Sequence, residues 1–438
     1  MLKQIRNSSA AHNFGWLVAD RGVRLMVGIV VGSWVARYLG RQDFGLLSYS
    51  LALVSIFAAL TPLGMEALIV REIIKDPRKG GKWLGTVIGF RSAAAVASSL
   101  IALGLAVGLR PGDSKAWLMV GTLSVGTIFQ SLESGELWFQ AHTQMRSLVL
   151  PRLLLFMAMS CLKITAVLHG AGVAWFSVLT ASEQIVSGSI TWILVRRSLG
   201  AGNRLSFHTP LGLKILSQSW PLAISALTVI LYMKLSQLVL SGMQGDAALG
   251  IYAAAIKIPE VATFLPGVLA SSLLPWLMRR RSEGSQAYGA ALQRFFRINA
   301  LMALSISIPV SIAAPWIIRL LYGPAFAEAG PVLAVYVWAL PFLFLGVARG
   351  QHLLNELMTQ FPLWFSATGL SINLAACALL IPRFGPMGAA LATVLSQLTA
   401  AFLLSFVHPK TRAVGRQQLL AILTPWKIRT IVGLSDGT

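Results

Sequence analysis

Basic side chains occur inside stretches of the sequence that are otherwise apolar. The seven residues of this kind are Arg21, Arg24, Arg91, Lys163, Lys234, Lys257 and Arg319. A charge near the middle of a bilayer costs on the order of 3 kcal/mol, so it normally faces a charged partner or a water-filled cavity. Acidic residues at comparable depth are fewer: Asp20, Glu133, Glu136, Glu183 and Glu260. We therefore expect the interior of the protein to carry a surplus of positive charge.

The spacing of some of these charges puts them on one side of a helix. Arg21 and Arg24 are three residues apart, and Asp20 precedes Arg24 by four. Lys257 and Glu260 are also three apart, a spacing that suits a structural ion pair as well as a binding site. An alternative interpretation of Arg24 is that its long side chain extends to the headgroups of the inner leaflet. The spacing alone leaves these alternatives open.

A surplus of cations that no internal carboxylate neutralises favours an anionic ligand. The Arg guanidinium group donates two parallel hydrogen bonds to a phosphate, and the Lys ammonium group acts as a point charge. We predict a cationic cavity that binds a diphosphate headgroup through Arg21, Arg24, Arg91, Lys234 and Lys257. Asp20 and Glu260 are the predicted charge partners.

Motifs for catalysis or metal binding do not occur in the sequence. It lacks a phosphate loop, a His-Glu-x-x-His helix and a Gly-x-Ser-x-Gly elbow. Its six His residues are scattered, and its two Cys residues lie in apolar runs. We therefore expect a protein that is not an enzyme and holds no metal or cofactor. Coupling to a gradient of Na⁺ or H⁺ is the expected energy source if the protein is a transporter.

The elements that position these charges are membrane helices. The chain has 438 residues, of which 56% are hydrophobic and 12% charged, and its mean hydropathy is +0.71. A span needs about 20 mostly apolar residues, and the sequence contains about 12 such stretches. They are expected at 16–38, 44–69, 83–109, 116–139, 148–168, 172–195, 215–240, 249–278, 298–321, 328–349, 361–381 and 385–407. The predicted class is an all-α polytopic membrane protein.

Lys and Arg residues are concentrated in alternate loops. By the positive-inside rule this distribution places the basic loops, and both termini, in the cytoplasm. Topology therefore explains most of the formal charge of +21, and nucleic acid is not an expected partner. A modest amphipathic tail at 417–431 is expected to lie on the inner membrane surface.

The two halves of the chain resemble each other. The stretch from Gly40 to Gly45 is similar to that from Gly245 to Gly250, and Pro62 and Pro266 have nearly the same offset in their halves. We predict a six-helix lobe at 1–195, a cytoplasmic linker at 196–214, a second six-helix lobe at 215–407 and a cytoplasmic tail at 408–438. This is a known transporter architecture, in which two six-helix repeats are related by pseudo-two-fold symmetry and have a central cavity between them.

Several motifs resemble those of polysaccharide-repeat (O-antigen, Wzx-type) flippases in the multidrug/oligosaccharidyl-lipid/polysaccharide (MOP) exporter superfamily. They lie at 35–45, 64–71, 249–258, 321–326 and 385–390. The resemblance implies about 12 helices in two lobes around a cationic cavity. It implies transfer of an undecaprenyl-diphosphate-linked oligosaccharide across a bacterial inner membrane by alternating access. It also implies that Arg21, Arg24, Lys234 and Lys257 are the cavity cations.

Two other functions within the superfamily remain open at this point. A drug or cation exporter would require a cavity dominated by Asp and Glu. In this sequence, basic residues outnumber acidic residues inside the apolar stretches. A peptidoglycan-precursor (lipid II) exporter usually has helices beyond the 12 or so expected here. The expected partners are the lipid-linked oligosaccharide and membrane lipids, with polysaccharide polymerase machinery as a candidate, and the protein is expected to be a monomer.

Overall fold

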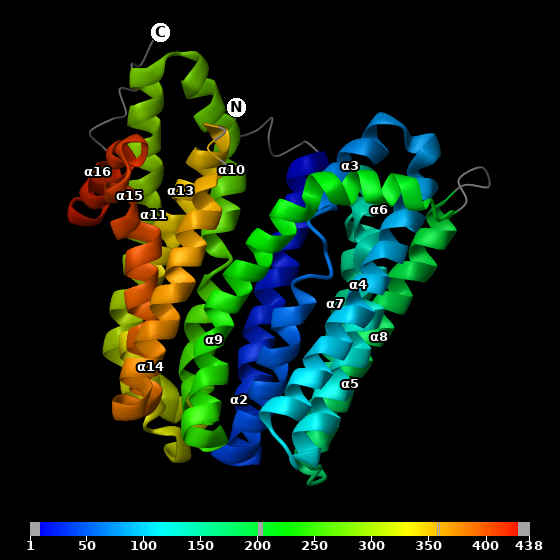
Figure 1. The fold of residues 1–438 in the computed structure, drawn as a ribbon, viewed down its shortest axis with the longest axis vertical. Helices are drawn as coiled ribbons and strands as arrows, with labels where there is room; N and C mark the ends of the chain where they lie inside the picture. Colours follow the sequence, from blue (N-terminus) through cyan, green and yellow to red (C-terminus); the bar gives the residue numbers. More distant parts are fainter. Residues whose placement is uncertain (1–8, 200–204, 357, 359, 428–438) are drawn as a thin grey trace. The chain divides into compact units, whose positions relative to one another are not determined.

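The computed structural model describes residues 9–199, 205–356, 358 and 360–427. These residues form helices and turns and contain no β-strand, so the all-α prediction is confirmed. Contacts divide the chain into two compact units, Met1–Lys234 and Leu235–Thr438, which we call unit 1 and unit 2 (Figure 1). The division falls inside a long helix, α9 (Thr209–Ala262).

Unit 1 is a bundle of long apolar helices with short elements at one end. Its elements are α2 (Ser9–Ala58), α3 (Glu66–Lys75), η1 (Pro77–Lys79), α4 (Gly80–Leu109), α5 (Ser114–Gln130), η2 (Ser131–Gly135), α6 (Glu136–Ala141), α7 (Arg146–Leu168), α8 (Val173–Ser198) and the first part of α9 (Thr209–Ala262). Within this unit, α3 and α6 lie at the end opposite the bend of α2 (Figure 1).

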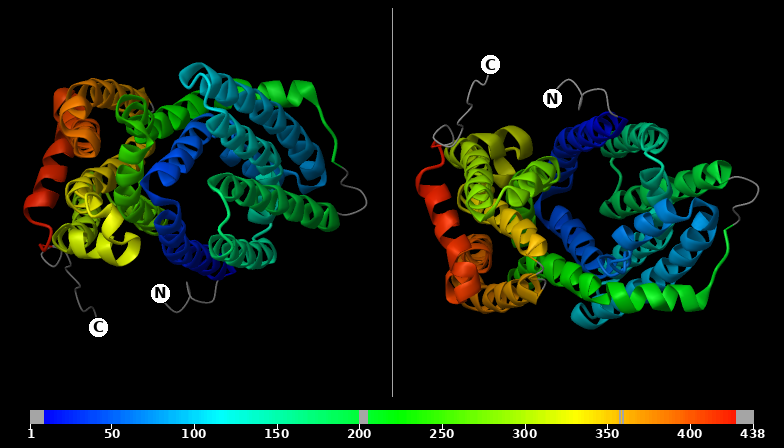
Figure 2. Two further views of the ribbon diagram at one scale, coloured as in Figure 1. Left: turned by 90° about the horizontal axis from the view of Figure 1, so that it is seen from below. Right: turned by 90° about the horizontal axis from the view of Figure 1, so that it is seen from above.

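Unit 2 continues α9 and ends in a short helix. Its further elements are α10 (Leu265–Ser282), α11 (Ser285–Tyr322), η3 (Pro324–Phe326), α12 (Ala329–Tyr336), α13 (Ala339–Asn355), α14 (Gln360–Gln397), the π-helical η4 (Leu398–Leu403), α15 (Leu404–Val407) and α16 (Pro409–Leu423). Helix α16 lies against α11 and α15 (Figure 2). Gln418 of α16 donates to the carbonyls of Leu345 and Ala401, so this part of the expected tail is packed onto unit 2.

The described chain contains eight helical runs that are long and apolar enough to cross a membrane. Three of these runs contain a break, at Gly40, Gly245 and Gly385, where the glycine has a positive φ. Each of the three therefore supplies two segments. Helix α5, continued by η2 and α6, supplies one more, which brings the described chain to the twelve segments that the sequence predicts.

The internal repeat is also visible in the backbone conformation of the glycine breaks. Gly40 has φ 71° and ψ −179°, and Gly245 has φ 80° and ψ 178°. The turn after α4 and the turn after α11 also have positive-φ glycines, Gly112 at 82° and Gly323 at 79°. An L-residue with a Cβ rarely adopts this combination of φ and ψ. In both halves, therefore, a glycine with positive φ reverses the direction of the chain between helices.

Replacing these turn glycines should destabilise the protein. A Cβ at Gly40 or Gly245 would have no atom within 4 Å, so the cost comes from φ alone. We expect Gly40→Ala and Gly245→Ala each to lose about 1–3 kcal/mol, measured as a lower thermal unfolding midpoint in detergent. Gly104→Ala near the C-terminal end of α4, where a Cβ would also have open space, is the control and should be neutral or stabilising. Equal effects at all three positions would contradict a role for φ.

Two predicted spans are broken in the structure. The span expected at 44–69 ends at Ala58, followed by a turn around Pro62 in which Leu63 and Gly64 have positive φ. The span expected at 249–278 is interrupted between Ala262 and Leu265, next to Pro266. Proline lacks the N–H that a helix interior needs and disfavours helical geometry in the residue before it. Hydropathy predicted continuous spans here because the residues around both turns are apolar.

The described part of the predicted linker is packed onto α4. A Cβ at Gly85 would lie 2.8 Å from the backbone of Ser206, and one at Gly89 would lie 2.5 Å from the Phe207 ring. The amide of His208 donates to Thr86 Oγ1 at 3.1 Å. Residues 200–204 lie outside the described residues. The segment from 205 therefore continues the core of unit 1.

Candidate substrate-binding site

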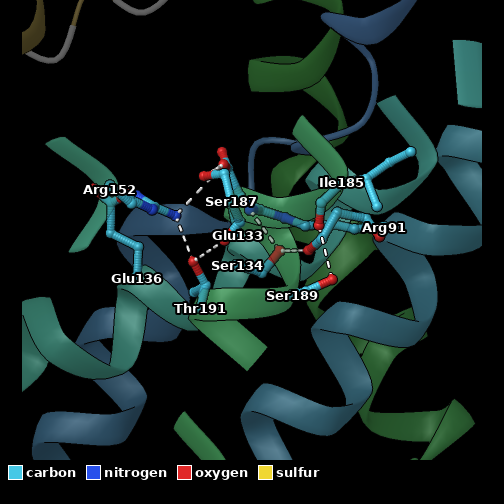
Figure 3. Close-up of polar contacts among 10 residues, drawn as sticks. Arg91, Glu133, Ser134, Glu136, Arg152, Ile185, Ser187, Ser189 and Thr191 are labelled. Carbon is cyan, nitrogen blue, oxygen red and sulfur yellow. Dashed lines mark hydrogen bonds and ion pairs between the residues drawn. The ribbon is translucent and has the colours of Figure 1, made fainter. Parts of the chain in front are cut away.

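Arg91 of α4 is buried and bound inside unit 1. Its Nη1 donates to Ser134 Oγ at 3.1 Å (Figure 3). Its Nη2 lies 3.5 Å from Glu66 Oε1. Its exposed fraction is 6%. The guanidinium group therefore joins α4 to the start of α3 and to η2. The sequence predicts Arg91 as a substrate-binding residue, whereas the structure gives it partners from the protein itself.

Arg152 of α7 forms the centre of a second polar cluster in unit 1 (Figure 3). Its Nη1 donates to Glu136 Oε2 at 2.7 Å, and its Nη2 donates to Thr191 Oγ1 at 2.9 Å. Glu133 Oε1 lies 3.7 Å away and also accepts from Ser187. Arg152 is missing from the seven basic residues counted inside apolar stretches of the sequence, although it lies inside α7 and within the span expected at 148–168. Its position within an apolar stretch was the signal that could have identified it.

Lys163 and Glu183 form an ion pair between α7 and α8. Lys163 Nζ donates to Glu183 Oε2 at 2.9 Å, and both side chains are about four-fifths buried. Together with Arg91 and Arg152, Lys163 belongs to a set of membrane-segment cations that have carboxylates nearby. The carboxylates are Glu66, Glu133, Glu136 and Glu183. Charge compensation within unit 1 therefore accounts for these three cations.

Arg24 lies in the first part of α2, where its side chain is partly buried. Its guanidinium carbon is 5.3 Å from the centre of the Phe156 ring of α7, a distance at which a cation and an aromatic face attract. Arg24 precedes Gly40 by 16 residues, which is roughly 24 Å along the helix. The side chains of Arg21 and Asp20 lie outside the described residues.

Lys234 and Lys257 flank the break at Gly245. Lys234 precedes this glycine by 11 residues and Lys257 follows it by 12. At about 1.5 Å per residue, each lies roughly 16 to 18 Å along its helix from the turn, near the middle of a hydrocarbon core about 30 Å thick. Lys234 is partly buried, and the side chain of Lys257 is exposed.

Lys257 differs from the other cations in its surroundings. In the described part of the chain it makes no ion pair, and in particular none with Glu260, the carboxylate one turn later. The neighbouring residues from Ile251 to Ile256 are buried, so the backbone at this point is part of the packed interior of unit 2. The alternative of a structural Lys257–Glu260 pair is therefore not realised here.

Unit 2 contains a buried polar cluster that joins α9 to α14. Ser236 donates to Asn373 Oδ1 at 3.2 Å, and its hydroxyl is 3.3 Å from that of Thr393. The hydroxyl of Tyr252 is 3.2 Å from Thr393 Oγ1, and Asn373 Nδ2 donates to Ser396. These groups satisfy one another, so they act as hydrogen bonds between helices. No group of three His, Cys, Asp or Glu side chains suited to a metal occurs among the residues described.

Arg349 is a second buried basic residue that is missing from the seven counted in the sequence, and it lies inside α13. It is 6% exposed and donates to Ser405 Oγ and to the carbonyl of Ala400, both at 2.8 Å. Its guanidinium carbon lies 3.9 Å from the centre of the Phe365 ring. Ala400 belongs to the π-helix η4, a widened turn of a kind often found at functional positions.

The fold defines the class of protein. The chain is similar to a solved structure of the lipid II flippase MurJ in an inward closed conformation, with a TM-score of 0.70, 14% identity, and coverage of 96% of this chain and 93% of that one. It is also similar to an inward-facing multidrug resistance MATE family transporter of the MOP superfamily, with a TM-score of 0.67, 14% identity and coverage of 92% and 96%. The fold is therefore that of MOP-superfamily transporters.

Residues 10–281 match the family model described as polysaccharide biosynthesis protein. The chain belongs to this family, and the predicted membership in the MOP superfamily is confirmed. A curated relative, the probable flippase AglR of Haloferax volcanii, is 24% identical over 415 residues, which cover 88% of this chain and 80% of the relative.

Proposed function

We propose that this protein is a flippase that moves undecaprenyl-diphosphate-linked oligosaccharide repeat units across a bacterial inner membrane by alternating access. The family supports a role in polysaccharide biosynthesis, and the similar AglR is named as a probable flippase. We place the Lys- and Arg-rich loops, and both termini, in the cytoplasm by the positive-inside rule. The lipid-linked oligosaccharide and the surrounding lipids are the partners in this proposal.

The observation that carries the proposal is the exposed side chain of Lys257 near mid-membrane depth. An ammonium group at this depth needs a water-filled surrounding or an anionic partner. The pair with Glu260 is not formed, so a ligand phosphate is the partner that suits it best. Lys234 at similar depth and Arg24 on α2 would add cationic potential. A diphosphate carries the negative charge that such groups attract.

A drug or cation exporter is less well supported. The carboxylates that would attract a cation in unit 1 are engaged with Arg91, Arg152 and Lys163. A lipid II exporter has the same diphosphate chemistry, and the similarity of fold to MurJ keeps it as the alternative. The two substrates differ in their sugars, so a direct comparison of lipid-linked substrates separates the two functions.

The test is complementation of a bacterial strain that lacks its own oligosaccharide flippase. We expect the protein to restore surface polysaccharide and to clear undecaprenyl-linked intermediates from the cytoplasmic side. Rescue of a strain that lacks its lipid II flippase, without rescue of the first strain, would overturn the proposed substrate. Collapsing the Na⁺ and H⁺ gradients separately identifies the coupling ion, because only one of them should stop transport.

Arg24 should tolerate Lys better than Ala. If the site needs positive potential before it needs the planar guanidinium fork, Arg24→Lys should keep a substantial share of polysaccharide display, and Arg24→Ala should lose most of it. Membrane insertion, measured by immunoblot of the membrane fraction, should be the same for both. Equal loss of display by both variants would indicate instead that the Arg24 guanidinium group makes a specific bidentate hydrogen-bonded contact with phosphate.

A further inference from the structure

A cavity of about 580 Å³ lies beside α3, at the Lys- and Arg-rich end of unit 1. Six of its lining residues belong to α3 and one, Gln140, to α6. They are Glu66, Ala67, Val70, Arg71, Ile74, Lys75 and Gln140. The volume is within the range of about 300–1,000 Å³ typical of sites for small molecules. None of the predicted substrate-binding residues lines it.

Helix α3 has the short length and the two contrasting faces that suit a helix at a membrane surface. It has 10 residues, too few to cross a bilayer. One side is anchored by Ile69 and Ile73, which are fully buried in the core of unit 1. The other side exposes Arg71, Ile74 and Lys75, with about three-fifths of each side chain accessible. A short helix with this division of polar and apolar faces suits the boundary between headgroups and hydrocarbon.

The cations of the cavity are held in place by a carboxylate outside its lining. Glu72 Oε1 lies 3.1 Å from Arg71 Nη2 and 3.3 Å from Lys75 Nζ. Burial alone would raise the pKa of Glu72, but the hydrogen bonds and charges of Lys75 and Arg71 lower it below its usual range. Glu72 is therefore ionised at neutral pH, and it neutralises one of the two positive charges. One positive charge remains for a ligand.

The acidic residue in the lining is already engaged. Glu66 lies 3.5 Å from Arg91, whose side chain is 7% exposed and also donates to Ser134. This contact balances the Glu66 carboxylate and holds the start of α3 against α4. The lining thus combines a net positive charge from Arg71 and Lys75 with the apolar side chains of Val70 and Ile74.

We propose that this cavity binds the phosphate of a membrane lipid headgroup, with the first part of the hydrocarbon chains against α3. Arg71 and Lys75 are the phosphate ligands, and the Gln140 amide is a further donor. Ala67, Val70 and Ile74 contact the apolar part of the lipid. A free phosphate ion would use the two cations but not the apolar side chains, so the cavity favours the lipid. None of the residues proposed for transport lines this site.

The test uses the purified full-length protein in detergent. Binding of a short-chain phosphatidylglycerol is measured by native mass spectrometry, with inorganic phosphate as the second ligand. We expect the double variant Arg71→Ala/Lys75→Ala to bind the lipid at least fivefold more weakly than the natural protein. The matched control, Arg78→Ala/Lys82→Ala, removes two charges from the same end of unit 1 outside the lining and should bind normally.

A third variant distinguishes the two sources of phosphate. Ile74→Gln keeps both cations and should weaken binding of the lipid while leaving inorganic phosphate unchanged. Equal binding of lipid by the two double variants would overturn the site. Inorganic phosphate that binds as tightly as the lipid would overturn the choice of a lipid. Circular dichroism of each variant confirms that loss of binding does not come from unfolding.

Discussion

Lys257→Ala should abolish polysaccharide display in the complementation assay while the protein still inserts into the membrane. A hydrogen bond to a charged group contributes about 1.5–3 kcal/mol, so loss of one phosphate contact should slow transport roughly 10- to 100-fold. Stability should change little, because the Lys257 side chain is exposed and makes no ion pair in the described chain. The expected signature is thus lost transport with an unchanged unfolding temperature.

Two further variants make the Lys257 result specific. Lys257→Arg keeps the positive charge at the same depth and should retain part of the activity. Lys115→Ala removes an exposed cation at the start of α5, at the opposite end of the unit from α3, and should leave transport unchanged. Full activity of Lys257→Ala would refute the role of this residue in binding diphosphate. A matching loss in Lys115→Ala would attribute the effect to overall charge.

Arg152→Met should have the largest effect on stability. The substitution leaves Glu133 and Glu136 close together without their shared cation, and it removes the donor to Thr191. Breaking a buried ion pair costs about 3–5 kcal/mol, and we expect about 2–4 kcal/mol here because Glu136 is 41% exposed. The measurement is the thermal midpoint of the detergent-solubilised protein, together with its yield in the membrane.

Neutralising the carboxylates should rescue that variant. Adding Glu133→Gln and Glu136→Gln to Arg152→Met removes the uncompensated charges, so the triple variant should recover most of the lost stability. Arg146→Met changes an exposed residue on the same helix and should shift stability by no more than about 1 kcal/mol. If the triple variant were as unstable as Arg152→Met, the ion pair would not be the cause.

Apolar patterning in this chain predicts the properties that depend on local sequence. Helical class and the number of membrane segments follow from the length and composition of each stretch, which are local properties. The bends at Gly40 and Gly245 follow from the backbone freedom of glycine, also a local property. The turn at Pro62 escaped prediction because the surrounding residues are apolar enough for a longer span.

The sequence by itself therefore determined that this is a helical membrane protein with a repeated plan, and it predicted a basic interior. The tertiary structure decided which basic side chains have partners. Arg91 meets a carboxylate 25 positions away, Arg152 meets a hydroxyl 39 positions away, and Ser187 meets a carboxylate 54 positions away. Such contacts depend on how helices pack, and packing is not encoded in the charge or spacing of any single stretch. The structure likewise decided that the side chain of Lys257, which the sequence already predicts as a cavity cation, is exposed.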